Sequence, residues 1–511
     1  MSWYLTKLMR AEMNKTENYE EWKKLAIRQD MVDGADIWKV KERSDLYDYR
    51  AIRKRVDTYR ELRANGDDEG LLFALNEGIH GNMGGMGKGV LYKKAHFGTK
   101  QLIVDYVEEV SSALEYLASP EVDSISLENK LEFFHRASHC YGRSALMLSG
   151  SGSLFYFHLG VVKALWEEDI LPSVISGSSG GAIVAAIVGC HSGGDLKKIF
   201  DPDLLKMEVE REKNLTKKGF LNRFSQVSSK EVENFFERLI PDITFQEAAE
   251  LTGIHINVSV APAEKHQTSR LLNDIASPNV MIREALLASA ALPGFYPAVT
   301  LAAKDQNGQR KPYLPSRKWI DGSVSDDLPI KRVMRLYGVN HTIVSQTNPL
   351  ALPFVTDSSS TSEWGLIKQT LKNTSKEWAL AAAKLIDRPM NLNKTSSRLL
   401  TLCSSVLAQT YTGDINILPP KRIHNPVYML MQPSSEEILQ MIKHGERATW
   451  PQIEKIRLQT KISRTLDNIV HDLEMALVHE VPRLPTRESK VSKASSSPKA
   501  RSARVSVVRA G

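Results

Sequence analysis

Residues 172–189 read PSVISGSSGGAIVAAIVG, two apolar runs on either side of a knot of small residues. The first run, residues 173–176, has the β-branched content of a short buried strand. The second run, residues 182–188, contains no turn residue and has the alanine content of a buried helix. The stretch therefore predicts a strand, a tight turn and a helix, with Ser179 at the centre of the turn.

The turn itself matches the pattern G-x-S-x-G through Gly177, Ser179 and Gly181. Glycines on both sides of the serine allow a turn too tight for larger side chains. The serine hydroxyl would then stand at a helix N-terminus, where unpaired N–H groups favour developing negative charge. The alternative is a glycine-rich loop that needs small residues only for packing. If Ser179 is a catalytic nucleophile, the sequence must also supply an oxyanion site and a general base.

The first requirement is an oxyanion site. A strand-like run at residues 145–148 precedes a small-residue loop at residues 149–153 and a helix that begins near Leu154. Acyl transfer needs two or three N–H donors aimed at the developing oxyanion. The candidate donors are the backbone N–H groups of Gly150, Ser151, Gly152 and Gly180. A dinucleotide-binding loop is the competing interpretation, but Phe155 occupies the position of its third glycine.

The second requirement is a general base for Ser179. In SRKWIDGSVSDDLPI, residues 316–330, a short strand ends at Trp319 and Ile320, and Asp321 with Gly322 forms a turn. The Asp321 carboxylate would project from the strand end. A DG pair is often only a turn. Several histidines follow Ser179, but none lies in a turn that marks it as catalytic.

The order of glycine-rich loop, G-x-S-x-G elbow and DG turn resembles the patatin-like phospholipase family, as does REALLASAALPGFYPAV at residues 283–299. The resemblance implies a Ser-Asp dyad without histidine, with Ser179 as nucleophile and Asp321 as base. An aspartate with a pKa near ~3.9 is a weak base, so Asp321 should be partly desolvated. Two differences from the family stand out. The oxyanion loop lacks the third glycine, where Phe155 stands, and the basic residue that the family often has, and Ser323 occupies a position where glycine or alanine is common.

Segments outside the catalytic motifs point to one subgroup of this family. The N-terminal third and the segments at residues 337–350 and 411–420 are similar to the triacylglycerol lipases of fungal and plant lipid droplets. This similarity implies hydrolysis of fatty acyl esters, foremost triacylglycerol, through an acyl-enzyme and without metal or other cofactor. A phospholipase, a lysophospholipase or an acyltransferase at the same site is the alternative, although the His-x₄-Asp motif of acyl-transferring relatives is absent. A non-catalytic lipid-surface scaffold is the alternative of another class.

Composition sets further limits. The chain has 511 residues, a formal net charge of +7 and three cysteines, Cys140, Cys190 and Cys403, without paired or metal-binding spacing. We therefore expect a reducing compartment and no metal site. The first residues lack the apolar region of a signal peptide, and no apolar run is long enough to span a membrane. The expectation is a cytoplasmic protein that associates peripherally with a membrane or lipid droplet, with lipid as its partner and no nucleic acid.

Four parts are predicted along the chain. Residues 1–140 form a helical region, and residues 141–350 alternate strands and helices as in an α/β domain with a mostly parallel sheet covered by helices on both faces. Within this domain, Ser277 and Pro278 should open a helix from Asn279. Residues 351–482 are expected to be helical. Residues 483–511 form a basic tail expected to be disordered, which could tether the protein to lipid, bind RNA or remain solvated.

Overall fold

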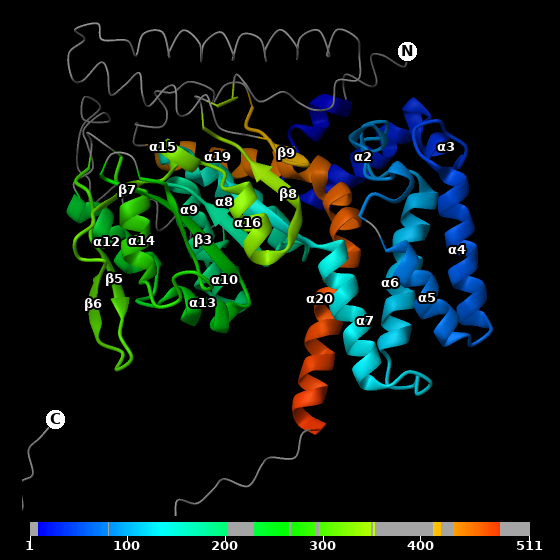
Figure 1. The fold of residues 1–511 in the computed structure, drawn as a ribbon. Helices are drawn as coiled ribbons and strands as arrows, with labels where there is room; N and C mark the ends of the chain where they lie inside the picture. Colours follow the sequence, from blue (N-terminus) through cyan, green and yellow to red (C-terminus); the bar gives the residue numbers. More distant parts are fainter. Residues whose placement is uncertain are drawn as a thin grey trace, which may run out of the picture.

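The computed structural model describes residues 9–79, 81–201, 229–264, 267–292, 296–348, 351–352, 412–420 and 433–480. An α/β unit and a group of N-terminal helices lie beside each other, and the C-terminal helices contact both (Figure 1). Among the described residues, no helix is both long and apolar enough to cross a bilayer.

The α/β unit is built on a seven-stranded sheet with the order β4-β3-β2-β1-β8-β9, in which β7 pairs with β3. Strands β3, β2, β1, β8 and β9 are parallel, and β4 and β7 run antiparallel to β3. The predicted mostly parallel sheet is confirmed. The strands are β1 (Arg143–Leu148), β2 (Val174–Gly177), β3 (His255–Pro262), β4 (Arg270–Leu272), β7 (Trp319–Asp321), β8 (Val339–Ser345) and β9 (Ile415–Ile417), with a separate hairpin of β5 (Leu301–Lys304) and β6 (Arg310–Tyr313).

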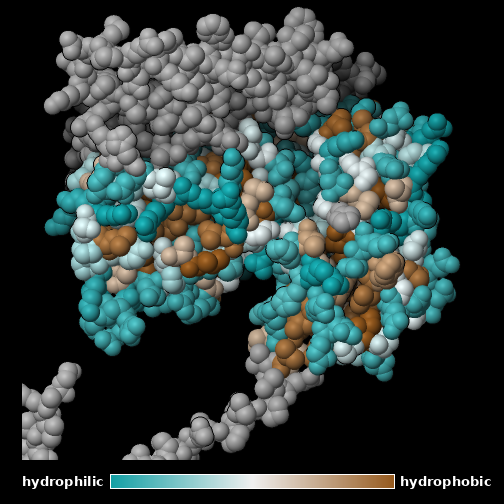
Figure 2. Space-filling model, in the orientation of Figure 1, coloured by the Kyte–Doolittle hydropathy of each residue, from teal (hydrophilic) through white to brown (hydrophobic). Residues whose placement is uncertain are grey.

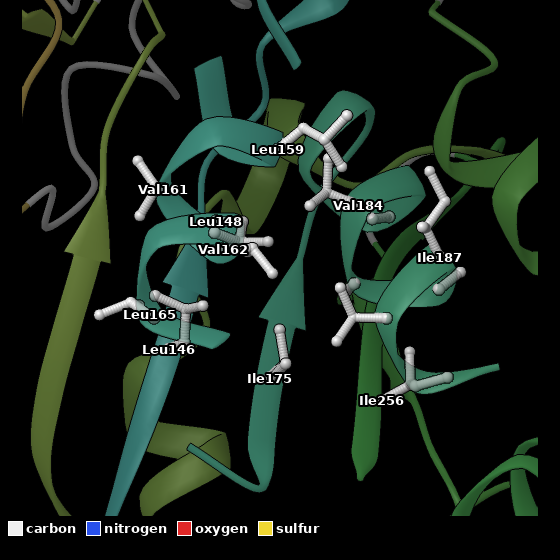
Figure 3. Close-up of a cluster of buried hydrophobic side chains, with 14 of the residues drawn as sticks. Leu146, Leu148, Leu159, Val161, Val162, Leu165, Ile175, Val184, Ile187 and Ile256 are labelled. Atoms are coloured by element: carbon white, nitrogen blue, oxygen red, sulfur yellow. The ribbon is translucent and has the colours of Figure 1, made fainter. Parts of the chain in front are cut away.

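Helices cover both faces of the sheet because its strands are apolar on both sides. On β1, Leu146 and Leu148 join the core beneath α8 and α9, as Figure 3 shows, whereas Ala145 and Met147 face a second cluster that includes Val333 of α16. The helices of this unit are α8 (Phe155–Glu167), α9 (Gly180–Gly189), α10 (Gly193–Ile199), α12 (Ser229–Leu239), α13 (Phe245–Thr252), α14 (Ile282–Ser289), α15 (Ser323–Asp326) and α16 (Ile330–Tyr337), with the short η3 (Gly152–Leu154).

The N-terminal helices have a core of their own, and the last helix completes it. Five apolar side chains on one face of α20 pack into this core at three- and four-residue spacing: Leu458, Ile462, Leu466, Ile469 and Leu473. The elements involved are α3 (Ala35–Val40), α4 (Tyr49–Ala64), α5 (Asp68–Gly78), η1 (Met83–Gly85), η2 (Gly89–Tyr92), α6 (Gln101–Ala118), α7 (Leu127–Tyr141) and α20 (Ile453–Glu480). Helix α2 (Tyr19–Asp33) instead packs Tyr19, Trp22 and Ala26 into the core of the α/β unit. The two ends of the described chain therefore fold as one helical group.

Helix α19 (Ser435–Thr449), which precedes η8 (Trp450–Gln452), lies directly on α8. Glycines allow this contact: a Cβ added at Gly160 would lie 1.9 Å from the Ile442 carbonyl oxygen, and one at Gly445 would lie 2.1 Å from that of Phe157. Lys163 on α8 forms an ion pair with Glu446 on α19 at 2.8 Å. Helix α19 is thus fixed to the α/β unit.

Two sequence expectations differ from the structure. Ser277 and Pro278 open no helix: α14 begins at Ile282, because the residues before it form a turn in which the Val280 N–H donates to the Ser277 carbonyl. The region expected to be helical, residues 351–482, also supplies a strand, β9, whose Ile415 and Ile417 are buried against β8. Three residues are too short a run to signal a strand by alternation. The predicted four-part division stays a prediction, and its tail from residue 483 lies outside the described residues.

Candidate active site

Ser179 lies between the end of β2 and the start of α9, in the predicted strand–turn–helix. Its backbone has φ 50° and ψ −121°, a region that non-glycine residues rarely occupy and that costs on the order of 1–3 kcal/mol. The turn is as tight as the flanking glycines predict, because a Cβ at Gly177 would lie 2.4 Å from the Gly181 carbonyl. The fold therefore holds a serine in a strained elbow at a helix N-terminus.

A buried serine on a neighbouring helix holds this elbow in place. The Ser179 N–H donates to Ser289 Oγ at 2.9 Å, and the Ser289 hydroxyl donates to the Ser259 carbonyl at 2.8 Å. Ser289 ends α14 and Ser259 lies on β3, so the chain of hydrogen bonds ties the elbow to the adjacent strand. No sequence pattern singled out Ser289, because its role depends on contacts between distant segments.

Strand register brings Asp321 to the elbow. Gly177 at the end of β2 is paired with Val258 of β3, and Asp321 at the end of β7 is paired with Val260 of the same strand. Gly322 permits this approach, since a Cβ there would lie 2.4 Å from the carbonyl carbon of Ser259. The nucleophile and base that the sequence analysis proposed therefore meet beside β3.

The environment of Asp321 alters its acidity. The residue is 2% exposed, and its Oδ1 accepts the Ser323 N–H at 2.8 Å. Burial raises the pKa of Asp321 to about 6, while interactions with Ser323 and with the Ser179 side chain act in the opposite direction. Among the described residues, no lysine, arginine or histidine forms an ion pair with this carboxylate. Such an aspartate is a stronger base than an exposed one and is still ionised near neutral pH.

The loop after β1 lies against the elbow, where the sequence analysis placed the oxyanion donors. A Cβ at Gly180 would lie 2.2 Å from Ser151 Oγ, which is how closely the two segments approach. The Gly150 N–H donates to Asp327 Oδ1 at 2.6 Å and is therefore engaged by a carboxylate. Within the described part of the chain, the N–H groups of Ser151, Gly152 and Gly180 donate to no protein acceptor. These three remain as candidate oxyanion donors.

A buried histidine forms hydrogen bonds that hold the same loop in place. His158 is fully buried on α8, with Nε2 3.0 Å from the Ser149 carbonyl oxygen and Nδ1 2.7 Å from Ser345 Oγ. Because a carbonyl only accepts, Nε2 carries the proton and Nδ1 accepts from the Ser345 hydroxyl. Burial lowers the pKa of His158 to about 3, although the bond to Ser149 acts in the other direction. His158 is therefore neutral and anchors the loop to β8.

The surroundings of Ser179 bear on the choice of base. Across the described ranges, no hydrogen bond joins Ser179 to a histidine, and no three side chains of the types that ligate metals gather into a candidate metal site. The Asp321 carboxylate is the titratable group that interacts with the Ser179 side chain. The arrangement can transfer a proton from a serine hydroxyl to a desolvated carboxylate next to unused N–H donors, which is the chemistry of acyl transfer.

Comparison with known proteins agrees with this geometry. A family described as a patatin-like phospholipase matches residues 146–334, and a domain of unknown function, DUF3336, matches residues 4–139. Triacylglycerol lipase 4 of Saccharomyces cerevisiae is 36% identical over 86% of this chain and 50% of its own length. Triacylglycerol lipase SDP1L of Arabidopsis thaliana is 31% identical over 97% of this chain and 62% of its own length.

The chain thus spans about half to three fifths of the length of these two relatives. A patatin-like phospholipase domain-containing protein of Meyerozyma guilliermondii is 33% identical over 90% of this chain and 67% of its own length. With the matched elbow, the DG turn and the preceding helical region, this similarity settles the family. The chain belongs to the patatin-like phospholipase family.

Proposed function

We propose that this protein is a serine lipid acyl hydrolase that works through a Ser-Asp dyad. The observation that carries the proposal is the strained Ser179 elbow beside Asp321, a buried carboxylate whose pKa is raised to about 6. A base poised near the operating pH is what proton transfer from a hydroxyl requires. Membership of the patatin-like phospholipase family supports the same chemistry.

The reaction has two halves. Asp321 accepts the proton of Ser179 as Oγ attacks the ester carbonyl, and N–H groups of Ser151, Gly152 and Gly180 stabilise the oxyanion. The tetrahedral intermediate collapses to an acyl-enzyme while Asp321 returns the proton to the leaving alcohol. Asp321 then accepts a proton from water as the water oxygen attacks the acyl-enzyme. The second collapse releases the fatty acid while Asp321 returns the proton to Ser179 Oγ.

Triacylglycerol is the proposed substrate. Two relatives at 31–36% identity carry the name triacylglycerol lipase, and the similarity includes the N-terminal helices as well as the α/β unit. A phospholipase at the same site is the second candidate, favoured by the description of the family that matches residues 146–334. The two candidates share the dyad and differ only in the substrate.

A test of both uses emulsified triacylglycerol beside phospholipid vesicles, with fatty acid release as the measurement. Wild type should release fatty acid from the emulsion, and Ser179→Ala should abolish that release. Release from vesicles alone would keep the dyad and replace the substrate. If Ser179→Ala retained wild-type release from either lipid, the proposed function would be wrong.

Peripheral association with a lipid surface is the second part of the proposal. Four apolar side chains are exposed at the α2–α3 corner, among them Ile37 and Val40, each 72% exposed. Ile37 and Val40 are three residues apart on α3 and so share one face. The four residues, here called the corner face, are Met31, Val32, Ile37 and Val40. In Figure 2 apolar residues reach the surface at the upper right, where Figure 1 places α2 and α3.

Basic residues accompany the corner face. Four exposed cations on these two helices and just after them form no ion pair among the described residues: Lys24, Arg28, Lys41 and Arg43. Exposed apolar residues next to unpaired cations are the composition of surfaces that insert into anionic lipid interfaces. The corner face therefore suits the surface of a membrane or lipid droplet.

The corner face can be tested separately from catalysis. Ile37→Glu together with Val40→Glu should weaken binding to anionic vesicles and slow hydrolysis of emulsified lipid, while hydrolysis of a soluble short-chain ester stays unchanged. Phe73→Glu is the matched control, because Phe73 is also apolar and 62% exposed but lies on α5. Equal vesicle binding by wild type and the double variant would contradict the assignment.

A further inference from the structure

Asp327 is a second buried carboxylate near the site, and its side chain contacts two of the surrounding segments. It follows α15 directly and is fully buried. Its Oδ1 accepts the Gly150 N–H at 2.6 Å, and its Oδ2 accepts Nδ2–H of Asn348 at 3.2 Å. Gly150 belongs to the oxyanion loop and Asn348 lies just beyond β8. The carboxylate therefore links that loop to the end of a central strand.

The main chain of the same residue contacts the elbow. The Ser178 hydroxyl donates to the Asp327 carbonyl oxygen at 2.7 Å, and Ser178 directly precedes Ser179. Ser178 is fully buried, so this hydrogen bond lies inside the structure. Asp327 thus touches the oxyanion loop through its side chain and the nucleophile elbow through its backbone.

The fit between these segments is close. A Cβ added at Gly150 would lie 2.9 Å from Ser323 Cβ and 3.1 Å from Asp327 Oδ1. Burial raises the pKa of Asp327 to about 7, the bonds from Gly150 and Asn348 lower it, and the charges of Asp321 and Asp326 raise it. Above neutral pH the carboxylate is ionised, and an ionised acceptor holds an N–H more strongly than a neutral one.

We propose that Asp327 is a positioning residue for acyl transfer: its carboxylate holds the oxyanion loop, through the Gly150 N–H, at the distance from Ser179 that the reaction requires. The inference rests on the proposed function. Fixing the Gly150 peptide by its N–H leaves the following N–H groups of Ser151 and Gly152 free to face a substrate oxygen beside Gly180. Oxyanion donors must lie about 2.7–3.1 Å from that oxygen, so a small displacement of the loop reduces the rate strongly.

The test compares Asp327→Ala and Asp327→Asn with a matched control, Asp326→Asn. Asp326 is the neighbouring aspartate, and its carboxylate lies 3.6 Å from Arg332. The substrate is a soluble p-nitrophenyl ester, so that lipid binding plays no part. A fluorophosphonate probe counts the active sites in each preparation, and rates are divided by that count. A role limited to folding would lower the count and leave the rate per site unchanged.

Asp327→Ala should lower kcat per site by about 10²-fold with little change in KM, because misplaced donors weaken transition-state binding. Asp327→Asn keeps an oxygen that can accept from Gly150 and should lose only about tenfold. Asp326→Asn should stay within about twofold of wild type. If Asp327→Ala yields no folded protein, the result for Asp327→Asn decides.

Wild-type kcat per site in Asp327→Asn and in any folded Asp327→Ala would overturn the positioning role. An equal loss in Asp326→Asn would also overturn it, because that loss would reflect general electrostatics rather than the contact to Gly150. Failure of the proposed function gives a different result, since turnover by wild type would then be absent or would survive Ser179→Ala.

Discussion

A buried carboxylate in the N-terminal helices, Asp30, and one in the α/β unit, Asp321, have opposite electrostatic surroundings. Asp30 of α2 has a fully buried side chain, and its carboxylate accepts from Lys39 Nζ at 2.9 Å and from the N–H groups of His96 and Phe97. Asp321 is almost equally buried, but its pKa is raised to about 6 and no cation pairs with it among the described residues. The first carboxylate stabilises the fold, and the second is the proposed proton acceptor.

Buried lysines extend the contrast. Lys100 Nζ donates to the Trp38 and Lys41 carbonyls at the end of α3, each at 2.6 Å. Lys130 Nζ donates to the Ser119 and Val122 carbonyls just after α6. Cations at helix C-terminal carbonyls stabilise the helix end. In the helical region both ammonium groups therefore have carbonyl acceptors, although burial lowers the pKa of Lys100 and of Lys130. The carboxylate next to Ser179 has no cationic partner among the described residues.

The largest expected effect is on catalysis. Asp321→Asn should lower ester hydrolysis by at least roughly 10³-fold, about as much as Ser179→Ala, because the dyad acts as a unit. Asp30→Asn, which alters the buried aspartate of the other region, should leave turnover per folded molecule within about twofold of wild type. Initial rates on a soluble ester measure both. Similar losses of activity in the two aspartate variants would contradict the distinction between a structural Asp30 and a catalytic Asp321.

The next effect is on stability and belongs to the helical region. Asp30→Ala removes the carboxylate that accepts from Lys39 and from two backbone N–H groups and leaves Lys39 only the Phe97 carbonyl, which should cost about 3 kcal/mol. Denaturant unfolding measures the change in the free energy of unfolding. A loss below about 1 kcal/mol would show that Asp30 is not the structural counterpart of Asp321.

At Asp321 we expect the opposite effect on stability: removing its charge should raise the free energy of unfolding. The fold raises the pKa of Asp321 from its ordinary 3.8 to about 6, so keeping this group ionised at pH 8 costs roughly 3 kcal/mol. Asp321→Asn should remove most of this cost, raising stability at pH 8 by about 2 kcal/mol. The gain should shrink as pH falls through 6 and vanish below about 4, where the aspartate is protonated in both states. Thermal unfolding at pH 8 and pH 4 tests this, and a destabilised variant at pH 8 would contradict it.

The smallest effect is a pH limb of activity. The base form of Asp321 is lost as pH falls through about 6, so kcat/KM should drop about tenfold for each further pH unit. Rates on a soluble ester between pH 4.5 and 8 give the profile. A profile that stays flat from pH 8 down to pH 5, as an aspartate with the ordinary pKa of an exposed side chain would give, would show that Asp321 is not desolvated in the working enzyme.

The two residues proposed to react could be predicted from the sequence because local patterns surround them. Ser179 lies in a glycine-framed turn between a strand and a helix, and Asp321 lies in a DG turn at a strand end. Their supporting residues lack such signals: Ser289, His158 and Asp327 contact segments far along the chain, His158 through Ser345 of β8. The same reason explains why the packing of α20 against the N-terminal helices was not foreseen. Local patterns predict elements, whereas partners across the fold emerge only from the structure.

The most direct test of the dyad is to map the covalent adduct formed with a lipid-like fluorophosphonate by mass spectrometry, with labelling rates for wild type and Asp321→Asn. We expect a single adduct on Ser179 and labelling at least roughly 10³-fold slower in Asp321→Asn. An adduct on another residue, or wild-type labelling of Ser179 in Asp321→Asn, would contradict it.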